Sequence, residues 1–474
     1  MSQAAAGRPR VVVLLPRGEA IRNFVYTGAL SCLRREVDVS LLSVIPNERL
    51  RQILAEEGGG VQELKGASAR WPVRFLWELA EMAHGRWLWS AAAQERWRLR
   101  DAEARTPAEK AKRAVKKVLC IPFATRRGVE ALSGVQGLAS RWLRTTDEYV
   151  DLLRRLRPAL VFNGSHVHSH LAHPVVEAAR WLGIPTAAFI FSWDNLTSQG
   201  RILPPYDHYL VWNENLRDQL LELYDGVERS HVYVTGTPQF DFHGRPEFQE
   251  DRETFCRGVG ADPRRPIVLY STGMANHMPG EEIIVERIAD MLGRMKEPDR
   301  PQLLVRVYAK DRTGRFEDLR RRRRDVLFPP IPWEPAHLTP LPEDSRLLTN
   351  TLLHAAVGVN VASTVSLELC MFDKPVINVG YNPPGAGAVP VDYIRYYDYD
   401  HYRPVVESGA VELARSESQL EDMLRGALTA PGRLRTERRE LVKTFFGETL
   451  DGRSATRVAR TIARISRERE WENA

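Results

Sequence analysis

Cysteine and long apolar runs are scarce in this sequence of 474 residues. Its four cysteines are far apart and form no pair with the spacing of zinc ligands. A reduced, cytoplasmic protein is the simplest interpretation, because disulfides belong to oxidising compartments. The apolar run at residues 11–15 is too short for a signal-peptide core, and no later run reaches the length of a membrane span. We therefore expect any membrane association to be peripheral.

The chain also lacks a strong net charge, an internal repeat and a low-complexity tail. The formal net charge is +6, and neither zinc-finger spacing nor an RNA-binding aromatic signature accompanies it, so we expect no nucleic-acid partner. A hydrophobic content of 43% and a charged content of 27% are those of an ordinary globular protein. A chain of this length exceeds a single hydrophobic core, which predicts two domains.

Apolar strands alternate with helices along both halves of the sequence. In the first half the predicted strands span residues 11–15, 37–44, 158–166 and 183–193, followed by "YDHYLVWN" and "HVYVTGTP". In the second half they span residues 266–274, 302–310, 355–361 and 376–380. This alternation predicts an α/β protein with two doubly wound, Rossmann-like domains that face each other across a cleft.

Changes in composition divide the chain further. We expect an N-terminal domain over residues 1–245, a C-terminal domain over 246–450 and a closing helix over 451–474. From about residue 66 to residue 157 the first domain is interrupted by a helical pattern rich in Trp and Arg. Basic helices with tryptophan fit the headgroup layer of an anionic membrane. A second interpretation fits equally well, in which the tryptophans are core residues and the charges form a solvated face.

The stretch "VNVASTVSLELCMFDKPVINVGY", residues 359–381, places a polar turn between two apolar runs. A buried strand ends in the turn, a short helix follows, and a second strand begins at Val376. The hydroxyl and N–H groups of Ser363, Thr364 and Ser366 make the turn a candidate anion site, with the Glu368 carboxylate one helical turn further on. The structural alternative is a capped helix whose N-terminal end favours the carboxylate.

Four stretches in a fixed order carry a resemblance to a known family. They are "RPALVFNGSH" with "GIPTAAFIF", then "DHYLVWNENLRDQLL" with "HVYVTGTPQFDF", then residues 338–380, and last "DGRSATRVARTI". Two Rossmann-like halves with this order of motifs resemble the GT-B glycosyltransferase superfamily. The likeness is to its branch with the UDP-GlcNAc 2-epimerases and the CDP-glycerol glycerophosphotransferases.

The resemblance implies a metal-independent glycosyltransferase that uses a nucleotide-sugar donor, with UDP as the expected nucleotide. The first domain would bind a cell-envelope, capsule-like or lipid-linked acceptor, as in polysaccharide biosynthesis. The second domain would bind the donor, with the diphosphate held by the Ser363–Ser366 turn and the ribose hydroxyls by Glu368. The protein would then be cytoplasmic or peripheral on the inner face of the membrane.

Two departures from the epimerase pattern favour a transferase. The chain has "STGMANHMPGEE" where the epimerases carry a His-Arg-Glu stretch, and Ser363-Thr364-Val365 where they carry Ser-Gly-Gly. Without glycines, close backbone approach to a phosphate is harder, although hydroxyl groups can substitute as donors. A CDP-polyol phosphotransferase remains the alternative, followed by an epimerase-like isomerase and by a non-catalytic membrane-bound scaffold.

Further donor-side candidates follow two other strands of the second half. Thr272 and Gly273 lie after the strand that begins near residue 266, where a glycine admits a ligand close to the backbone. Alternation predicts Arg306, Tyr308 and Lys310 on one face of the next strand, where cations could neutralise a leaving diphosphate. A plain strand–helix turn and a solvated strand end are the corresponding alternatives.

The candidate catalytic bases lie after strands of the first half. Asp194 and His166 follow two of these strands, and either could take a proton from an acceptor hydroxyl. Glu19 is a third candidate, and Trp193 could stack on a sugar. A helix-cap turn would explain "WDNLTS" equally well. We expect no metal site at His168, His170 and His173, because the first two point to opposite sides of a strand and no carboxylate is spaced to join them.

Overall fold

The computed structural model describes residues 8–58, 60–66, 69–143, 146–167, 171–296, 300–384 and 392–472. It divides into two compact units. The first contains residues 1–241, 334–339 and 449–474, and the second contains residues 242–333 and 340–448. The sequence placed this boundary at residue 245 and treated the last helix as a separate segment. The helix instead belongs to the first unit. No helix in the described part of the chain is long and apolar enough to cross a membrane.

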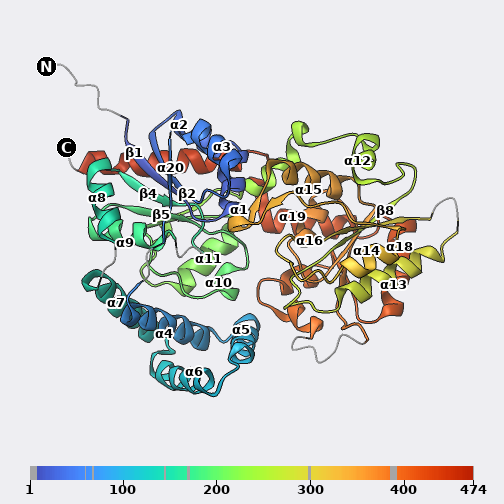
Figure 1. Ribbon diagram of the computed structural model, residues 1–474, viewed down its shortest axis with the longest axis horizontal. Coiled ribbons are helices and arrows are strands. Elements are labelled where there is room, and N and C mark those ends of the chain that lie inside the picture. Colours follow the sequence, from blue (N-terminus) through green and yellow to red (C-terminus); the bar gives the residue numbers. More distant parts are fainter. Residues whose placement is uncertain are drawn as a thin grey trace. The chain divides into compact units, whose positions relative to one another are not determined.

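A seven-stranded parallel sheet forms the centre of the first unit (Figure 1). Its strands, in chain order, are β1 (Arg10–Leu15), β2 (Asp38–Ser43), β3 (Val61–Glu63), β4 (Leu160–Asn163), β5 (Thr186–Phe189), β6 (His208–Val211) and β7 (Val232–Val234). Their order across the sheet is β3-β2-β1-β4-β5-β6-β7. The strand order reverses direction at β1, which is the arrangement of a doubly wound sheet.

Helices cover this sheet. They are α1 (Gly18–Ile21), the π-helix η1 (Arg22–Tyr26), α2 (Ala29–Arg34), α3 (Glu48–Gly58), α8 (Asp147–Leu156), α9 (His173–Trp181), α10 (Asn195–Ser198), α11 (Glu214–Leu223) and α20 (Ser454–Glu472). The helix α20 comes from the far end of the sequence and packs on α2 (Figure 1). The segment after β1 is helical, and all four residues of α1 are buried.

The predicted helical insertion is confirmed and forms a layer of its own beside the first sheet (Figure 1). It consists of α4 (Trp71–Leu88), α5 (Ala91–Glu103), α6 (Pro107–Cys120), the short 3-10 helix η2 (Ile121–Phe123) and α7 (Arg126–Trp142). Its core joins Leu79, Ala83, Cys120, Val129 and Leu132. Trp77, Trp87 and Trp97 pack against this core, whereas Trp71 and Trp142 are exposed. The core interpretation is therefore right for the first three tryptophans, whereas membrane contact of the exposed two stays a prediction.

The second unit is built on a six-stranded parallel sheet of order β10-β9-β8-β13-β14-β15. The strands are β8 (Ile267–Ser271), β9 (Gln302–Arg306), β10 (Val326–Leu327), β13 (Val357–Asn360), β14 (Val376–Val379) and β15 (Glu412–Ala414). The main helices are α12 (Arg252–Val259), α13 (Glu281–Gly293), α14 (Glu317–Arg322), α15 (Pro342–His354), α16 (Val365–Met371), α17 (Arg403–Glu407), α18 (Glu417–Thr429) and α19 (Arg435–Phe446). The expected α/β class with two Rossmann-like domains is confirmed.

One strand is shorter than predicted. The sequence indicated a strand over residues 302–310, but β9 ends at Arg306. Residues 307–310 leave the sheet, and the N–H of Tyr308 donates to the Thr272 hydroxyl instead of to a strand neighbour (2.8 Å). The predicted common face of Arg306, Tyr308 and Lys310 is therefore wrong, because strand alternation ends with the strand.

Candidate functional site

Polar side chains lie level with one another at the carboxyl edge of the second sheet. Strand register places Arg306 beside Ser271, Ser271 beside Asn360, and Asn360 beside Asn378. The four residues end or nearly end β9, β8, β13 and β14. In an open α/β sheet this edge is where ligands bind. The donor-side candidates of the sequence therefore gather along one edge of the second unit.

Thr272 and Gly273 start the loop from β8 to α13. The Thr272 N–H donates to the Arg306 carbonyl oxygen (3.1 Å), which fixes the loop to β9. The Gly273 N–H donates to the Glu281 carboxylate at the start of α13 (2.8 Å). A Cβ at Gly273 would lie 1.9 Å from the Met278 sulfur, so only glycine fits there without a shift. The glycine thus serves the close folding of the loop on itself.

Glu281 is fully buried beneath this loop and binds several groups at once. Arg315 donates to its carboxylate (2.8 Å), and the Tyr270 hydroxyl donates from the other side (3.1 Å). Burial raises the pKa of Glu281 to about 7, against the opposing effect of Arg315 and the Gly273 N–H. Arg315 also donates to the Gly273 carbonyl oxygen (2.9 Å) and pairs with Asp311 (2.7 Å). Arg315, which was not predicted from the sequence, thus links the Gly273 carbonyl oxygen to the Glu281 and Asp311 carboxylates.

The two predicted cations differ in their surroundings. Arg306 pairs with the buried Asp344, at 2.7 Å between guanidinium and carboxylate. Its second terminal nitrogen, Nη1, is buried and has no hydrogen-bond partner among the described residues. The Lys310 ammonium lies 5.8 Å from the centre of the Tyr308 ring. Asp344, which neutralises part of the Arg306 charge, was not predicted.

The Ser-Thr turn after β13 is closed by Asn360. The Asn360 side-chain oxygen accepts from the Ser363 N–H (3.2 Å) and from the Ser366 hydroxyl (3.0 Å). The Ser366 hydroxyl also accepts from Tyr402 (2.8 Å) and from the Asn378 amide (3.0 Å). Ser366 is completely buried, so its hydroxyl belongs to this internal network. Ser363 and Thr364 are the partly exposed members of the turn.

Glu368 lies one turn into α16 and is 7% exposed. Its Oε1 is 3.0 Å from Nε2 of His243, and the other ring nitrogen of His243 is 3.2 Å from the Thr349 hydroxyl. The imidazole thus fixes the position of the carboxylate. The sequence missed His243, which comes 125 positions before its partner. Its place two residues after the Thr-Gly-x-Pro-x-x-Asp stretch was the only available signal.

The base candidates of the first unit gather at the carboxyl edge of its own sheet. His166 follows β4, and its Nδ1 lies 3.2 Å from the Phe189 carbonyl oxygen and 3.3 Å from the Phe191 nitrogen, at the end of β5. The Arg17 guanidinium, which pairs with Glu19, lies 4.8 Å from the centre of the Phe191 ring. Phe191 therefore contacts His166 through its backbone nitrogen and Arg17, the partner of Glu19, through its ring.

Asp194 lies three residues beyond Phe191, at the start of α10. Its Oδ2 accepts from the Ser198 hydroxyl (2.7 Å), so the carboxylate also stabilises the short helix. Trp193, predicted to stack on a sugar, is 6% exposed, and its stacking role stays a prediction. His168 and His170 lie outside the described residues. The described residues hold no group of three or more metal-ligand side chains.

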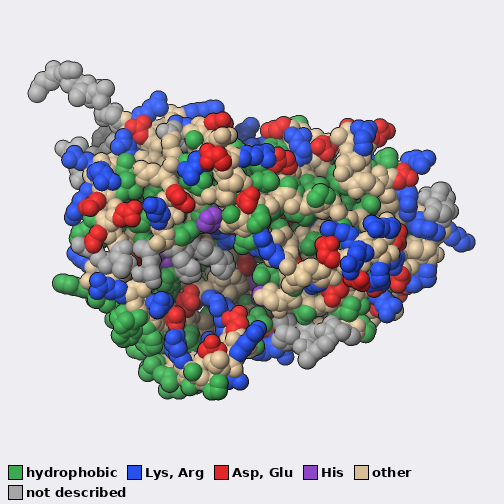
Figure 2. Space-filling view, in the orientation of Figure 1, with side chains coloured by type: hydrophobic (Ala, Val, Ile, Leu, Met, Phe, Trp, Pro, Cys, Tyr) green, Lys and Arg blue, Asp and Glu red, His purple; other side chains and the backbone are tan. Residues whose placement is uncertain are grey.

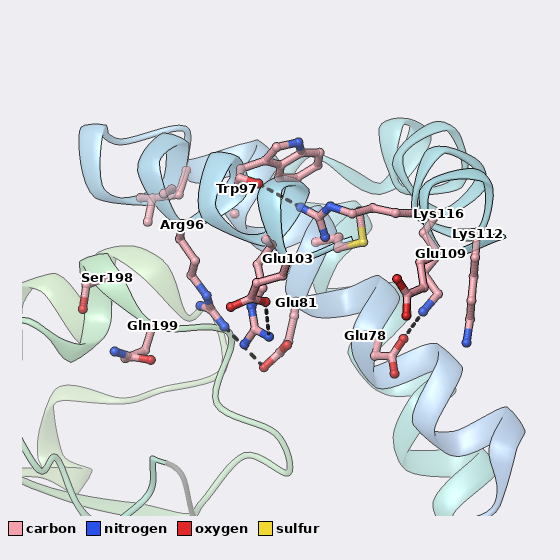
Figure 3. Close-up of a pocket in the computed structure, with 16 residues that line it drawn as sticks. Glu78, Glu81, Arg96, Trp97, Glu103, Glu109, Lys112, Lys116, Ser198 and Gln199 are labelled. Carbon is pink, nitrogen blue, oxygen red and sulfur yellow. Dashed lines mark hydrogen bonds and ion pairs between the residues drawn. The ribbon is translucent and has the colours of Figure 1, made fainter. Parts of the chain in front are cut away.

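A cavity of about 480 Å³ lies between α4, α5 and α6 of the insertion (Figure 3). Ser198 and Gln199, at the end of the Asp194 helix, contribute to its wall. Acidic and basic side chains alternate around it, with Glu81 paired to Arg96 and Glu78 paired to Lys116 (Figure 3). The cavity therefore brings charged hydrogen-bonding groups of the insertion next to the segment that carries a candidate base.

The second unit has a larger cavity, of about 1020 Å³, which lies elsewhere. Its wall includes Pro266, Ala355 and Pro375, which precede β8, β13 and β14. These residues mark the amino ends of the strands, opposite the polar edge. Ligand sites of doubly wound sheets lie at the carboxyl ends, so we do not assign the donor to this cavity.

Solved structures share the fold of this chain. A UDP-GlcNAc 2-epimerase from Methanocaldococcus jannaschii has 14% identity and a TM-score of 0.53, with 96% of this chain and 99% of the other covered. The enzyme from Neisseria meningitidis bound to UDP-GlcNAc has 10% identity, a TM-score of 0.52 and the same coverage. A glycosyltransferase from Rickettsia africae has 11% identity and a TM-score of 0.50, with 98% and 99% covered. The chain has the GT-B fold.

This result confirms, at the level of the fold, the resemblance to the GT-B branch near the UDP-GlcNAc 2-epimerases. No protein-family model and no curated protein matches the sequence. Identities of 10–14% show a shared fold and do not transfer an activity. In a GT-B protein the chemistry must be argued from the side chains at the two sheet edges described above.

Proposed function

We propose that this GT-B protein is a glycosyltransferase that moves a sugar from a nucleotide-sugar donor, with UDP as the nucleotide, to a cell-envelope, capsule-like or lipid-linked acceptor. The observation that carries the proposal is the Glu368 carboxylate, held in place by His243 after the Ser-Thr turn. A fixed carboxylate with unused acceptor capacity suits the adjacent hydroxyl groups of a ribose. Structures of the same fold hold UDP-GlcNAc or UDP, which supports the choice of ligand.

The diphosphate of the donor would bind the remaining groups of the second edge. Ser363 and Thr364 supply hydroxyl and N–H donors, and Thr272 and Gly273 supply the facing loop. The unpaired Nη1 of Arg306 and the ammonium of Lys310 would stabilise the charge that develops on the leaving diphosphate. With two cations in this role we propose that no metal cofactor takes part. Ser366 would act indirectly, by holding Asn360 and the turn in place.

The acceptor would be activated in the first unit. Asp194 or His166 would take the proton from the acceptor hydroxyl, a contribution of about 10²–10⁴-fold to the rate. Glu19, which pairs with Arg17, is the remaining candidate. An inverting transferase needs such a base for the acceptor hydroxyl, and these residues at the polar edge of the first sheet are the candidates.

Replacement of Glu368 tests the donor assignment. Glu368→Ala should weaken UDP binding in calorimetry by about 1–3 kcal/mol, the scale for losing hydrogen bonds to a charged group. Glu368→Gln keeps an oxygen that can accept from His243 but removes the charge, so its loss should be smaller. Glu440→Gln removes the same charge from an exposed position in α19 of the same unit and serves as control. Unchanged UDP affinity in both Glu368 variants would contradict the assignment.

A donor screen separates the reactions that this fold supports. Incubation with UDP-, GDP- and CDP-activated donors should show slow hydrolysis of a UDP-sugar and no change of sugar configuration. Turnover of a CDP-polyol alone would make the protein a phosphotransferase. Interconversion of two UDP-sugars without any acceptor would make it an isomerase.

A further inference from the structure

The outer side of the helical insertion carries a surface of exposed apolar side chains. It consists of Val115, Val118 and Leu119 of α6, Ile121 of η2, and Val135, Leu138 and Trp142 of α7. Each is at least 43% exposed, and Trp142 reaches 83%. We name this set the α6–α7 apolar surface. Figure 2 shows hydrophobic side chains gathered over these helices at the lower left.

The spacing of these residues places them on one face of α6 and on one face of α7. Val115, Val118 and Leu119 stand at positions i, i+3 and i+4 of α6, and Val135 and Leu138 stand three apart on α7. Small exposed residues, Ala111, Ala114, Ala131 and Gly134, continue the same faces without a charge. The opposite faces hold the buried residues of the insertion core, so the fold does not need the outer apolar residues.

A rim of cations surrounds the surface. Lys110, Arg127 and Arg141 are exposed, and within the described ranges none has a carboxylate at ion-pair distance. By contrast, Lys116 pairs with Glu78, and Lys117 pairs with Asp101 (2.5 Å), on the inner side of α6. The nearest acidic side chain of α6, Glu109, accepts from the N–H groups of Arg105 and Thr106 at the helix start (2.9 and 3.0 Å). The unneutralised charge beside the apolar surface is thus positive.

We propose that the α6–α7 apolar surface docks onto an anionic phospholipid bilayer. The apolar side chains would enter the boundary between headgroups and acyl chains, and the rim cations would meet the lipid phosphates. A contiguous apolar face of this kind is uncommon on a monomeric protein and marks an interaction site. A second copy of the chain fits less well, because pairing would bring two rims of cations together. This docking does not require a nucleotide. If the proposed function holds, it would bring the charged cavity of the insertion close to an acceptor in the membrane.

Vesicle sedimentation of the full chain, without nucleotide, tests this proposal. Binding is measured to vesicles of phosphatidylcholine alone and of phosphatidylcholine with one quarter phosphatidylglycerol. We expect binding to the anionic vesicles that weakens as salt rises, because attraction to headgroups is screened within about a Debye length. The double variant V118S/L138S keeps the charge and should bind about tenfold more weakly, since it loses buried apolar area.

The contribution of the rim cations is tested with two double variants that remove the same charge at different places. K110Q/R141Q should lower binding to anionic vesicles, whereas R320Q/R321Q, which removes two cations from the exposed α14 of the second unit, should not. Equal losses in the two variants would show unspecific attraction and overturn the proposal. Equal binding to neutral and anionic vesicles, or no binding to either at low salt, would also overturn it. A concentration-dependent dimer that V118S/L138S abolishes would assign the surface to a second copy instead.

Discussion

At the residue scale, His84 shows how far burial alone can change a side chain. It lies in α4 at 1% exposure, and neither ring nitrogen has a hydrogen-bond partner among the described residues. Burial lowers the pKa of His84 to about 3, with further contributions from the charges of Arg201 and Arg96. The imidazole is therefore neutral in the folded protein at any pH above this value.

We predict that acid weakens the fold through this residue. Because the folded pKa lies below the ordinary value of about 6.5, the unfolded state binds the extra proton between the two values. The free energy of unfolding is not reduced by His84 above about pH 6.5. It falls as the pH falls through this range, and at pH 5 it is lower by about 2 kcal/mol. Denaturant unfolding at several pH values measures it. His84→Phe should flatten the dependence over this range, and a wild-type slope retained in the variant would assign it to other groups.

Residue roles were predictable only where they follow from position in the chain. Glu368, Ser363 and Thr364 could be selected because they follow a strand within one motif. The burial of Ser366 could not, since its partners Asn360, Asn378 and Tyr402 meet only after β13 and β14 have paired. The same holds for His243, whose contact with Glu368 joins segments 125 positions apart.

At the scale of elements, the edge of a parallel sheet decides which residues can work together. The sequence indicated that β4 and β5 end in polar stretches, and the carboxyl ends of parallel strands meet at one edge. His166 and Asp194 are thus neighbours of the same edge for a topological reason. What the sequence could not supply was the role of α10, where Asp194 also accepts the Ser198 hydroxyl.

We predict that Asp194→Asn lowers turnover while UDP affinity stays unchanged. The amide keeps the shape and can still accept from Ser198, but it cannot take the acceptor proton, so a loss of about 10²–10⁴-fold is expected. Single-turnover assays with the acceptor measure it, with His166→Ala compared in parallel. Full activity in Asp194→Asn together with loss in His166→Ala would assign the base to the histidine. Full activity in both would leave Glu19 as the next residue to replace.

At the scale of the whole molecule, the final helix α20 is held by the segment that follows the last strand of the first sheet. Asp241, the last residue of the Thr-Gly-x-Pro-x-x-Asp stretch, accepts from the N–H groups of Ser454 (3.1 Å) and Ala455 (2.8 Å) at the start of α20. Arg457 of the same helix donates to the Thr235 carbonyl oxygen (2.8 Å). The motif therefore binds the start of the final helix, within the stretch "DGRSATRVARTI".

We predict that Asp241→Ala destabilises the first unit by about 1–2 kcal/mol, the scale for loss of a helix cap. Two buried N–H groups would lose their acceptor, and α20 would separate more readily from α2. Hydrogen exchange should become faster in α20 and α2 and stay unchanged in β8 and β13 of the second unit. Asp251→Ala, which removes the cap of α12, is the matched control and should act on the second unit instead. Faster exchange across both units in Asp241→Ala would contradict this assignment.

The sequence by itself determined the alternation of strands and helices, and with it the α/β class, the two Rossmann-like halves and the helical insertion. These features depend on local periodicity, which a linear pattern carries in full. Tertiary structure alone decided that α20 belongs to the first unit, that Arg306 pairs with Asp344, and which tryptophans of the insertion are exposed. Each of these depends on which distant segments become neighbours in the fold, and no spacing along the chain encodes that.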